Sequence, residues 1–81
     1  MIVYRAQLST YATTVGDNCA NDYHVVADAL FVNLKAAESW TEREGRAELR
    51  EKARLIADLH HEQLFMIADP AAIIDEYELR F

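Results

Sequence analysis

Residues 22–40 read DYHVVADALFVNLKAAESW, and this stretch decides which class of fold the chain can adopt. Its first half alternates in the way expected of a strand with one buried face. From Asn33 onward the apolar residues recur every three or four positions, which is the period of a helix. Asn33 itself suits an N-cap, because its side-chain oxygen can accept a hydrogen bond from a free amide of the first turn. The stretch therefore predicts a strand over 23–31 that leads directly into a helix.

Upstream, residues 2–11 also alternate, and their β-branched and aromatic content predicts another strand. Between the two strands, TTVGDNCAND is rich in residues that favour turns. It predicts a loop of about eight residues rather than a two-residue hairpin. The residues expected to face the core are Ile2, Tyr4, Ala6 and Leu8 in the first strand and Tyr23, Val25, Ala27, Ala29 and Phe31 in the second.

The helical spacing of apolar residues continues downstream over a stretch longer than one helix could bury against the sheet. One helix through the whole region would be about 50 Å long, whereas a strand of about eight residues spans about 26 Å. Near the middle, Thr41 and Glu44 form a capping box and Gly45 weakens a helix. Two helices, over 34–43 and 46–67, are therefore favoured, and an unbroken helix would overhang the sheet and pack on a second copy. The downstream apolar stripe consists of Leu49, Ala53, Ile56, His60, Leu64 and Ile67.

The end of the chain returns to the strand period. Asp69-Pro70 ends the second helix, because proline disfavours helical geometry at the preceding residue. Residues 74–81 then alternate, which predicts a third strand with a solvated outer face. Its inner side is expected to hold Tyr77, Leu79 and Phe81, and its outer side Glu76, Glu78 and Arg80. The chain is thus expected to form a single α+β domain over 1–81, of order ββααβ, with a three-stranded, mainly antiparallel sheet and two helices (or one long broken helix) on one face.

The sequence contains no recognisable catalytic or metal-binding pattern. The histidines and the lone Cys19 lack the partners that a zinc site or an activated nucleophile requires. With two glycines, the chain cannot form the usual glycine-rich phosphate loop. We therefore expect no enzyme, no cofactor and no metal.

Charge is unevenly distributed along the chain. The net charge is −6, and residues 55–81 hold six acidic residues and one basic residue, a net charge of −5. This argues against direct nucleic-acid binding, for which a basic patch is expected. The sequence shows no signal-peptide pattern, and its longest apolar run is about half the length that spans a bilayer. A cytoplasmic protein that does not bind membranes is expected.

Four segments, MIVYRAQL, NDYHVVADALF, FVNLKAAESW and IIDEYELRF, carry a family resemblance. Their layout resembles a group of short phage and prophage proteins with a tyrosine-rich opening strand, a polar loop, an aromatic-led second strand, a helix and an acidic closing strand. The resemblance implies a small accessory protein of a mobile element, a setting in which anti-CRISPR proteins and other inhibitors of host complexes recur. It supplies no catalytic residues.

The leading hypothesis from the sequence is a non-enzymatic protein-binding module that occupies the surface of a host protein complex, such as one of a defence system. A structural or regulatory homodimer is the alternative, and a small metal-dependent enzyme is third. Phe65 is either an exposed aromatic among mixed charges on the second helix or a core residue of its last turn. The predicted partner-binding residues are Asp58, His61, Glu62, Phe65, Asp75, Glu76 and Glu78.

Overall fold

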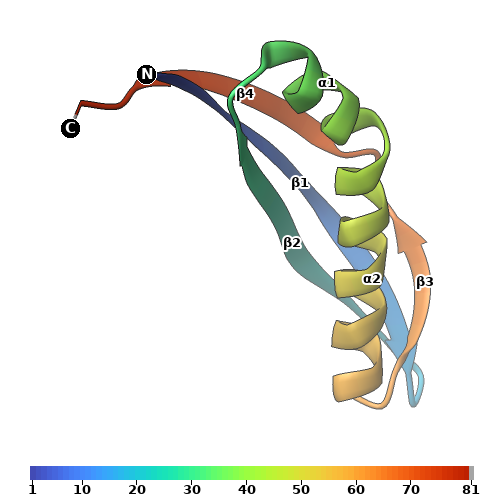
Figure 1. Ribbon diagram of the computed structural model, residues 1–81. Coiled ribbons are helices and arrows are strands. Elements are labelled where there is room, and N and C mark those ends of the chain that lie inside the picture. Colours follow the sequence, from blue (N-terminus) through green and yellow to red (C-terminus); the bar gives the residue numbers. More distant parts are fainter. Residues whose placement is uncertain (81) are drawn as a thin grey trace.

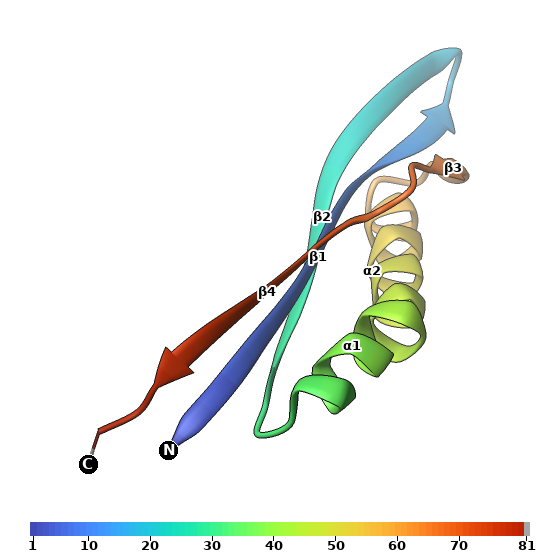
Figure 2. The same ribbon diagram turned by 90° about the horizontal axis from the view of Figure 1, so that it is seen from above.

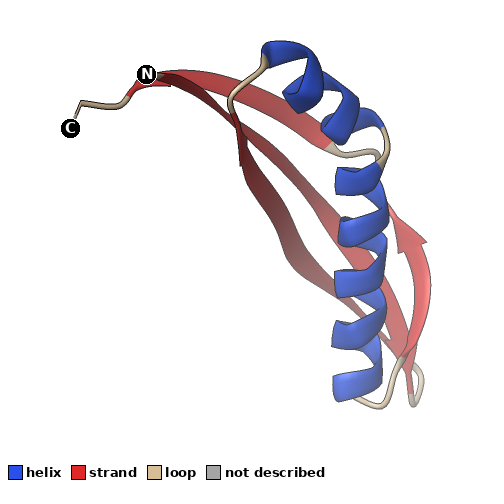
Figure 3. Ribbon diagram, viewed as in Figure 1, coloured by secondary structure: helices blue, strands red, loops and turns tan. Residues whose placement is uncertain are grey.

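The computed structural model describes residues 1–80, which form a bent sheet with two helices on one face (Figures 1 and 3). The predicted α+β class, with a strand pair followed by two helices, is confirmed. The elements in chain order are β1 (Ile2–Gly16), β2 (Cys19–Phe31), α1 (Leu34–Glu42), α2 (Glu44–Leu59), β3 (Gln63–Ile67) and β4 (Ala71–Glu78).

The long strand β1 is the centre of the sheet. On one side it pairs antiparallel with β2 along nearly its whole length. On its other side it pairs antiparallel with β4 over residues 2–9 and with β3 over residues 12–15. Between these two, the Ala68 amide donates to the Tyr11 carbonyl at 2.9 Å. The sheet thus has four strands, of which β3 and β4 follow one another along a single edge of β1.

The core lies between the sheet and the helices. The predicted inward faces of β1 and β2 are confirmed at Ala6, Leu8, Val25 and Ala27, all of which are buried. Ile2 shares this face but is exposed, because β1 and β4 continue beyond α1 toward the two termini (Figure 1). The central cluster consists of Leu8, Ala12, Val25, Ala27, Leu49 and Ala53, with Trp40, Ile56, Leu64 and Ile67 packed around it.

The predicted start of the first helix and the predicted break between the helices are also confirmed. The Asn33 side chain accepts hydrogen bonds from the amides of Lys35 at 2.8 Å and Ala36 at 3.2 Å, so it caps α1. A single residue, Arg43, separates the helices. The predicted capping box does not form, because Thr41 lies inside α1 and its hydroxyl donates to the Glu38 carbonyl.

The loop predicted between the first two strands is wrong, because the strands are joined by a two-residue turn. Gly16 pairs with Cys19, and the two residues between them, Asp17 and Asn18, have φ angles of 42° and 73°. Short-chain polar residues tolerate this left-handed conformation, and tight hairpin turns require it. The threonine-rich segment before the turn therefore extends β1 instead of forming a loop.

The second helix is shorter than predicted, ending at Leu59 rather than at residue 67. His61 has a φ angle of 55°, and the Glu62 amide donates to the Ala57 carbonyl at 2.8 Å. These are features of a helix C-terminus closed by a left-handed residue, a role that glycine usually takes. The segment 63–67, predicted as helix, is strand β3.

The predicted last strand exists with shifted bounds and inverted faces. It pairs Tyr77 with Val3 and Glu76 with Tyr4, which places Glu76 on the face that carries the helices and Tyr77 on the opposite face. The expectation that Tyr77 faces the core and Glu76 and Glu78 the outside is therefore wrong. Phe81, which was assigned to this strand, lies outside the described residues.

Candidate binding surface

Residues 1–80 form an elongated molecule. Its principal extents are 52 × 23 × 15 Å and its radius of gyration is 15.1 Å, whereas a compact domain of this length has about 12 Å. The 15 residues of β1 at about 3.3 Å each account for the length, and both helices lie on the same side of the sheet (Figure 2). The other side has no covering layer in this part of the chain.

We call this uncovered side the open sheet face. The strand register assigns its members, because side chains alternate between the two faces of a sheet. On β1 and β4 these residues alternate with the residues that share a face with the buried Ala6 and Leu8. Seven large side chains of this face are exposed: Tyr11, Val15, Leu30, Phe65, Met66, Ile73 and Tyr77.

The open sheet face combines these apolar groups with a few polar ones. The ring of Tyr11 lies 5.1 Å from that of His24 on the neighbouring strand. Nearer the termini, Arg5 and Asp28 form a salt bridge of 2.7 Å, and the resulting hydrogen bond is the main cause that raises the pKa of Arg5. Apolar and aromatic surface interspersed with a few charges is the composition of a protein-binding patch.

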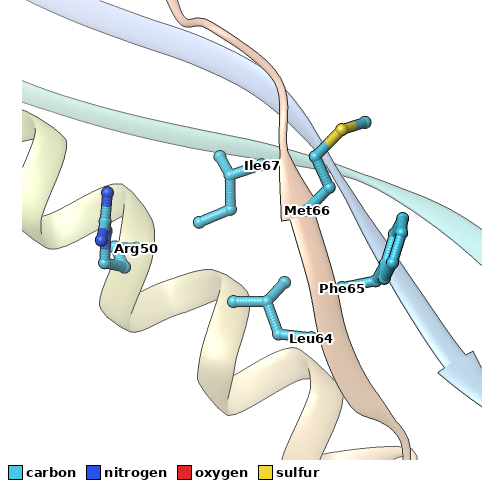
Figure 4. A pocket seen from close by; sticks show the side chains of 5 residues that line it. All are labelled: Arg50, Leu64, Phe65, Met66 and Ile67. Atoms are coloured by element: carbon cyan, nitrogen blue, oxygen red, sulfur yellow. The ribbon is translucent and has the colours of Figure 1, made fainter.

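The bulged edge strand β3 presents its side chains in an uneven pattern. The register with β1 shifts between Thr13 and Thr14, so that Phe65 is an extra residue in the edge. As a result Leu64 and Ile67 both point toward α2, while Phe65 and Met66 point away from it (Figure 4). Phe65 is 73% exposed. Of the two alternatives for this residue, the exposed one is confirmed, although on a strand and not on a helix.

The seven predicted partner-binding residues do not form one site. Asp58, His61, Glu62 and Phe65 lie around the end of α2 and the start of β3, whereas the other three lie on β4, which pairs with the opposite end of β1. Asp75 belongs to the open sheet face, and Glu76 and Glu78 to the helix-bearing face. Sequence reasoning missed Tyr11, Met66 and Ile73. Residues 71–78 read AAIIDEYE, in which like residues are neighbours, so no alternation distinguishes Ile73 from Ile74.

The Glu62 side chain makes several hydrogen bonds to β1 and β2 that the sequence did not indicate. Its carboxylate accepts hydrogen bonds from Asn21 Nδ2 at 2.6 Å, Tyr23 OH at 2.9 Å and Thr14 Oγ1 at 3.1 Å. The Tyr23 ring also stacks on that of His60, with ring centres 4.9 Å apart. These contacts fasten the β1–β2 hairpin to the segment that follows α2.

The contacts shift the ionisation of both partners. The hydrogen bond from Asn21 is the largest influence and lowers the pKa of Glu62 below its ordinary value of 4.5; partial burial opposes this, while Tyr23, Thr14 and His60 reinforce it. The hydrogen bond to this carboxylate raises the pKa of Tyr23 above 10.0. The folded state therefore favours the ionised carboxylate and the neutral phenol.

We expect Glu62→Gln to destabilise the protein in a pH-dependent manner. Because the folded-state pKa of Glu62 is lowered, its stabilising contribution is present above pH 4.5 and is lost as pH falls through the folded-state pKa. Urea unfolding followed by circular dichroism should show the variant below wild type at neutral pH, with a gap that closes in acid. Glu48→Gln on the exposed surface of α2 is the control and should show no such gap. A gap for Glu62→Gln that persists unchanged in acid would contradict this assignment.

The histidines and the cysteine, which are the residue types most often used for catalysis or metal binding, are dispersed over the molecule. Among residues 1–80, no three His, Cys, Asp or Glu side chains gather as they would around a metal ion. His24 lies on the open sheet face, His60 stacks on Tyr23, and the exposed Cys19 lies at the hairpin turn. In the same part of the chain, neither helix has the length and apolar character needed to cross a membrane.

Comparison with known proteins finds no matching family, no matching curated protein and no matching solved structure.

Proposed function

We propose that this protein is a non-enzymatic binding module that holds a partner protein against its open sheet face. The observation that carries the proposal is the amount of surface left uncovered. The chain exposes 5869 Å², whereas a compact monomer of 9.3 kDa exposes about 5,000 Å². The excess is close to the roughly 800 Å² that each partner buries in a standard protein–protein interface.

The chemistry of the open sheet face supports a protein as the partner. Tyr11, Phe65 and Met66 supply large apolar side chains of the kinds enriched at interface centres. The salt bridge between Arg5 and Asp28 supplies polar groups already oriented by one another. In keeping with the resemblance to phage accessory proteins, we propose a host protein complex, of a defence system for example, as the partner, and the cytoplasm as the place of binding.

The test compares two variants of a tagged protein in a pull-down from bacterial lysate with mass spectrometry. Tyr11→Thr with Ile73→Thr makes the open sheet face polar while keeping residues that suit strands, and should reduce recovery of a stoichiometric partner by about tenfold or more. Leu55→Gln with Leu59→Gln alters exposed leucines of α2 instead and should leave recovery unchanged. Equal recovery with both variants, or loss with both, would reject the open sheet face as the binding surface.

A homodimer is the second candidate, and the outer edge of β2 favours it. If two copies pair antiparallel about Val26, His24 lies opposite Asp28 of the second copy, where its imidazole N–H can donate a hydrogen bond to the carboxylate. However, Lys52 Nζ already donates to the Val26 carbonyl at 2.9 Å, and a lysine at this place protects an edge from pairing. Sedimentation of the purified protein decides between the candidates, because a monomer at all concentrations excludes the dimer.

A further inference from the structure

A groove runs between α2 and the outer edge of β3, and it is additional to the open sheet face. It has two neighbouring cavities of about 250 and 170 Å³, both of which are lined by Arg50 and Ile67. Leu64 and Ile67 point into it from β3, and Arg50 lines it from α2 (Figure 4). Its upper part is bounded by Arg46 and by the turn at Asp69 and Pro70.

The flank of α2 above this groove is basic although the protein is acidic overall. Arg46, Arg50 and Arg54 recur every four residues, and successive residues at this spacing lie on one side of a helix. Arg46 is 3.3 Å from Asp69, and Arg54 pairs with Glu51 on its own helix. Within residues 1–80, Arg50 has neither an ion pair nor a side-chain hydrogen bond. We call these three residues the arginine row.

The floor of the groove adds an unpaired strand edge. β3 pairs with β1 on one side only, so along its outer edge the described chain offers no further strand. An extended peptide can pair with such an edge through main-chain hydrogen bonds, while alternate side chains reach pockets on either side. The β2 edge differs, since Lys52 occupies it from the opposite flank of α2.

We propose that the groove binds an extended acidic segment of a partner protein, added as a strand to the outer edge of β3. Successive arginines of the row are about 6 Å apart along the helix axis, and alternate residues of a strand are about 6.6 Å apart. Carboxylates at alternate positions of the peptide therefore match the row, and each can accept charge-assisted hydrogen bonds from a guanidinium. A second copy of this chain is disfavoured at this edge, because symmetric pairing would bring two arginine rows together.

The intervening side chains of such a segment would point to the other face of the sheet. There they would lie beside Phe65 and Met66, which point away from α2 (Figure 4). The expected ligand thus alternates acidic with apolar residues. An oligonucleotide could also supply anions to arginines, but it could not pair with a strand edge, and the net charge of −6 opposes its approach.

The test is fluorescence anisotropy with a short labelled peptide in which glutamate alternates with valine. We expect saturable binding at low salt, weakening as salt rises, and no binding of the same peptide with lysine in place of glutamate. A peptide with proline at two adjacent central positions should bind at least about tenfold more weakly than one with alanine there, because alternate amides of a strand face opposite edges and one of the two must donate to β3. Failure of the glutamate peptide to bind, or unchanged binding of the proline peptide, would overturn the proposal.

Two variants locate the site. Arg50→Glu should weaken peptide binding by about tenfold or more, whereas Lys35→Glu, the same charge change in the first turn of α1, should change it little. Equal weakening by both variants would show a general charge effect and reject the groove. Tighter, Arg50-dependent binding of a labelled oligothymidylate would also reject an acidic peptide as the ligand. The double variant Tyr11→Thr with Ile73→Thr, which alters the open sheet face, should bind the peptide as wild type does. The peptide-binding test and the pull-down test of the open sheet face can therefore fail independently.

Discussion

Leu8→Ala is expected to lower the free energy of unfolding by about 2–5 kcal/mol, a large part of the roughly 4–12 kcal/mol that a domain of this size possesses. Leu8 is fully buried at the centre of β1, where it pairs with Ala27 on β2 and Ala72 on β4. These neighbours along the sheet are alanines, whose side chains cannot extend into the space that the substitution leaves. The expected loss therefore includes a cavity term in addition to the lost burial.

Urea unfolding measured by circular dichroism gives this difference directly, provided the transition remains two-state. Leu55→Ala is the matched control, because Leu55 lies on α2 with 56% of its surface exposed, and its loss should stay within about 0.5 kcal/mol. A Leu8→Ala variant as stable as Leu55→Ala would show that Leu8 is not packed as the structure has it.

Gly45→Ala is expected to destabilise the protein, although helix propensity alone predicts a gain of about 1 kcal/mol. A methyl group on Gly45 would lie 2.7 Å from Leu8 Cδ1 and 2.8 Å from the Trp40 carbonyl oxygen. The carbonyl belongs to the backbone of α1 and cannot rotate away, so the two helices or the sheet must move apart. Overpacking of this kind costs about 1–3 kcal/mol. Over most of that range the cost is larger than the gain of about 1 kcal/mol from helix propensity.

The control is Ala47→Gly, an exposed position in the same helix, which should lose about 1 kcal/mol by propensity alone. The double variant with Leu8→Ala adds a sharper test. Because the shortened residue 8 no longer meets the new methyl group, Gly45→Ala should cost less in that background than in wild type. A stabilised Gly45→Ala protein would contradict the close approach of α1, α2 and β1.

Local signals in the sequence were sufficient where one residue controls one feature. Asn33 caps α1 as expected, since its side chain needs only the amides of the next turn. The break between the helices fell within the predicted interval, because a long straight helix has no sheet beneath it. Alternation in 23–31 identified Val25 and Ala27 as core residues, since a half-buried strand repeats every two residues.

The second helix was extended too far because two different structures give the same spacing. Leu64 and Ile67 are three residues apart, which puts them on one side of a helix. In β3 the extra residue at Phe65 also puts them on one side, facing α2. The true helix end lacked its usual glycine signal, because His61 takes the left-handed conformation there.

The candidate sites depend on pairings between distant segments, which explains why the sequence revealed so little of them. The strand-favouring residues Ile73, Ile74 and Tyr77 are visible in the sequence, but only the register against β1 decides that Tyr77 and Ile73 face away from the helices. Arginines at four-residue spacing are equally visible, but β3 must lie beside α2 before they border a groove.

By itself the sequence determined the α+β class, the cap of α1 and the division into two helices, because propensity, capping and hydrophobic period act over a few neighbouring residues. Only the tertiary structure decided that β1 is long enough to hold β3 and β4 in succession, that both helices cover one face, and that the other stays open. These features are set by the register between strands whose paired residues lie 48 to 76 positions apart in the chain, and a change of one residue in that register exchanges the two faces of the sheet.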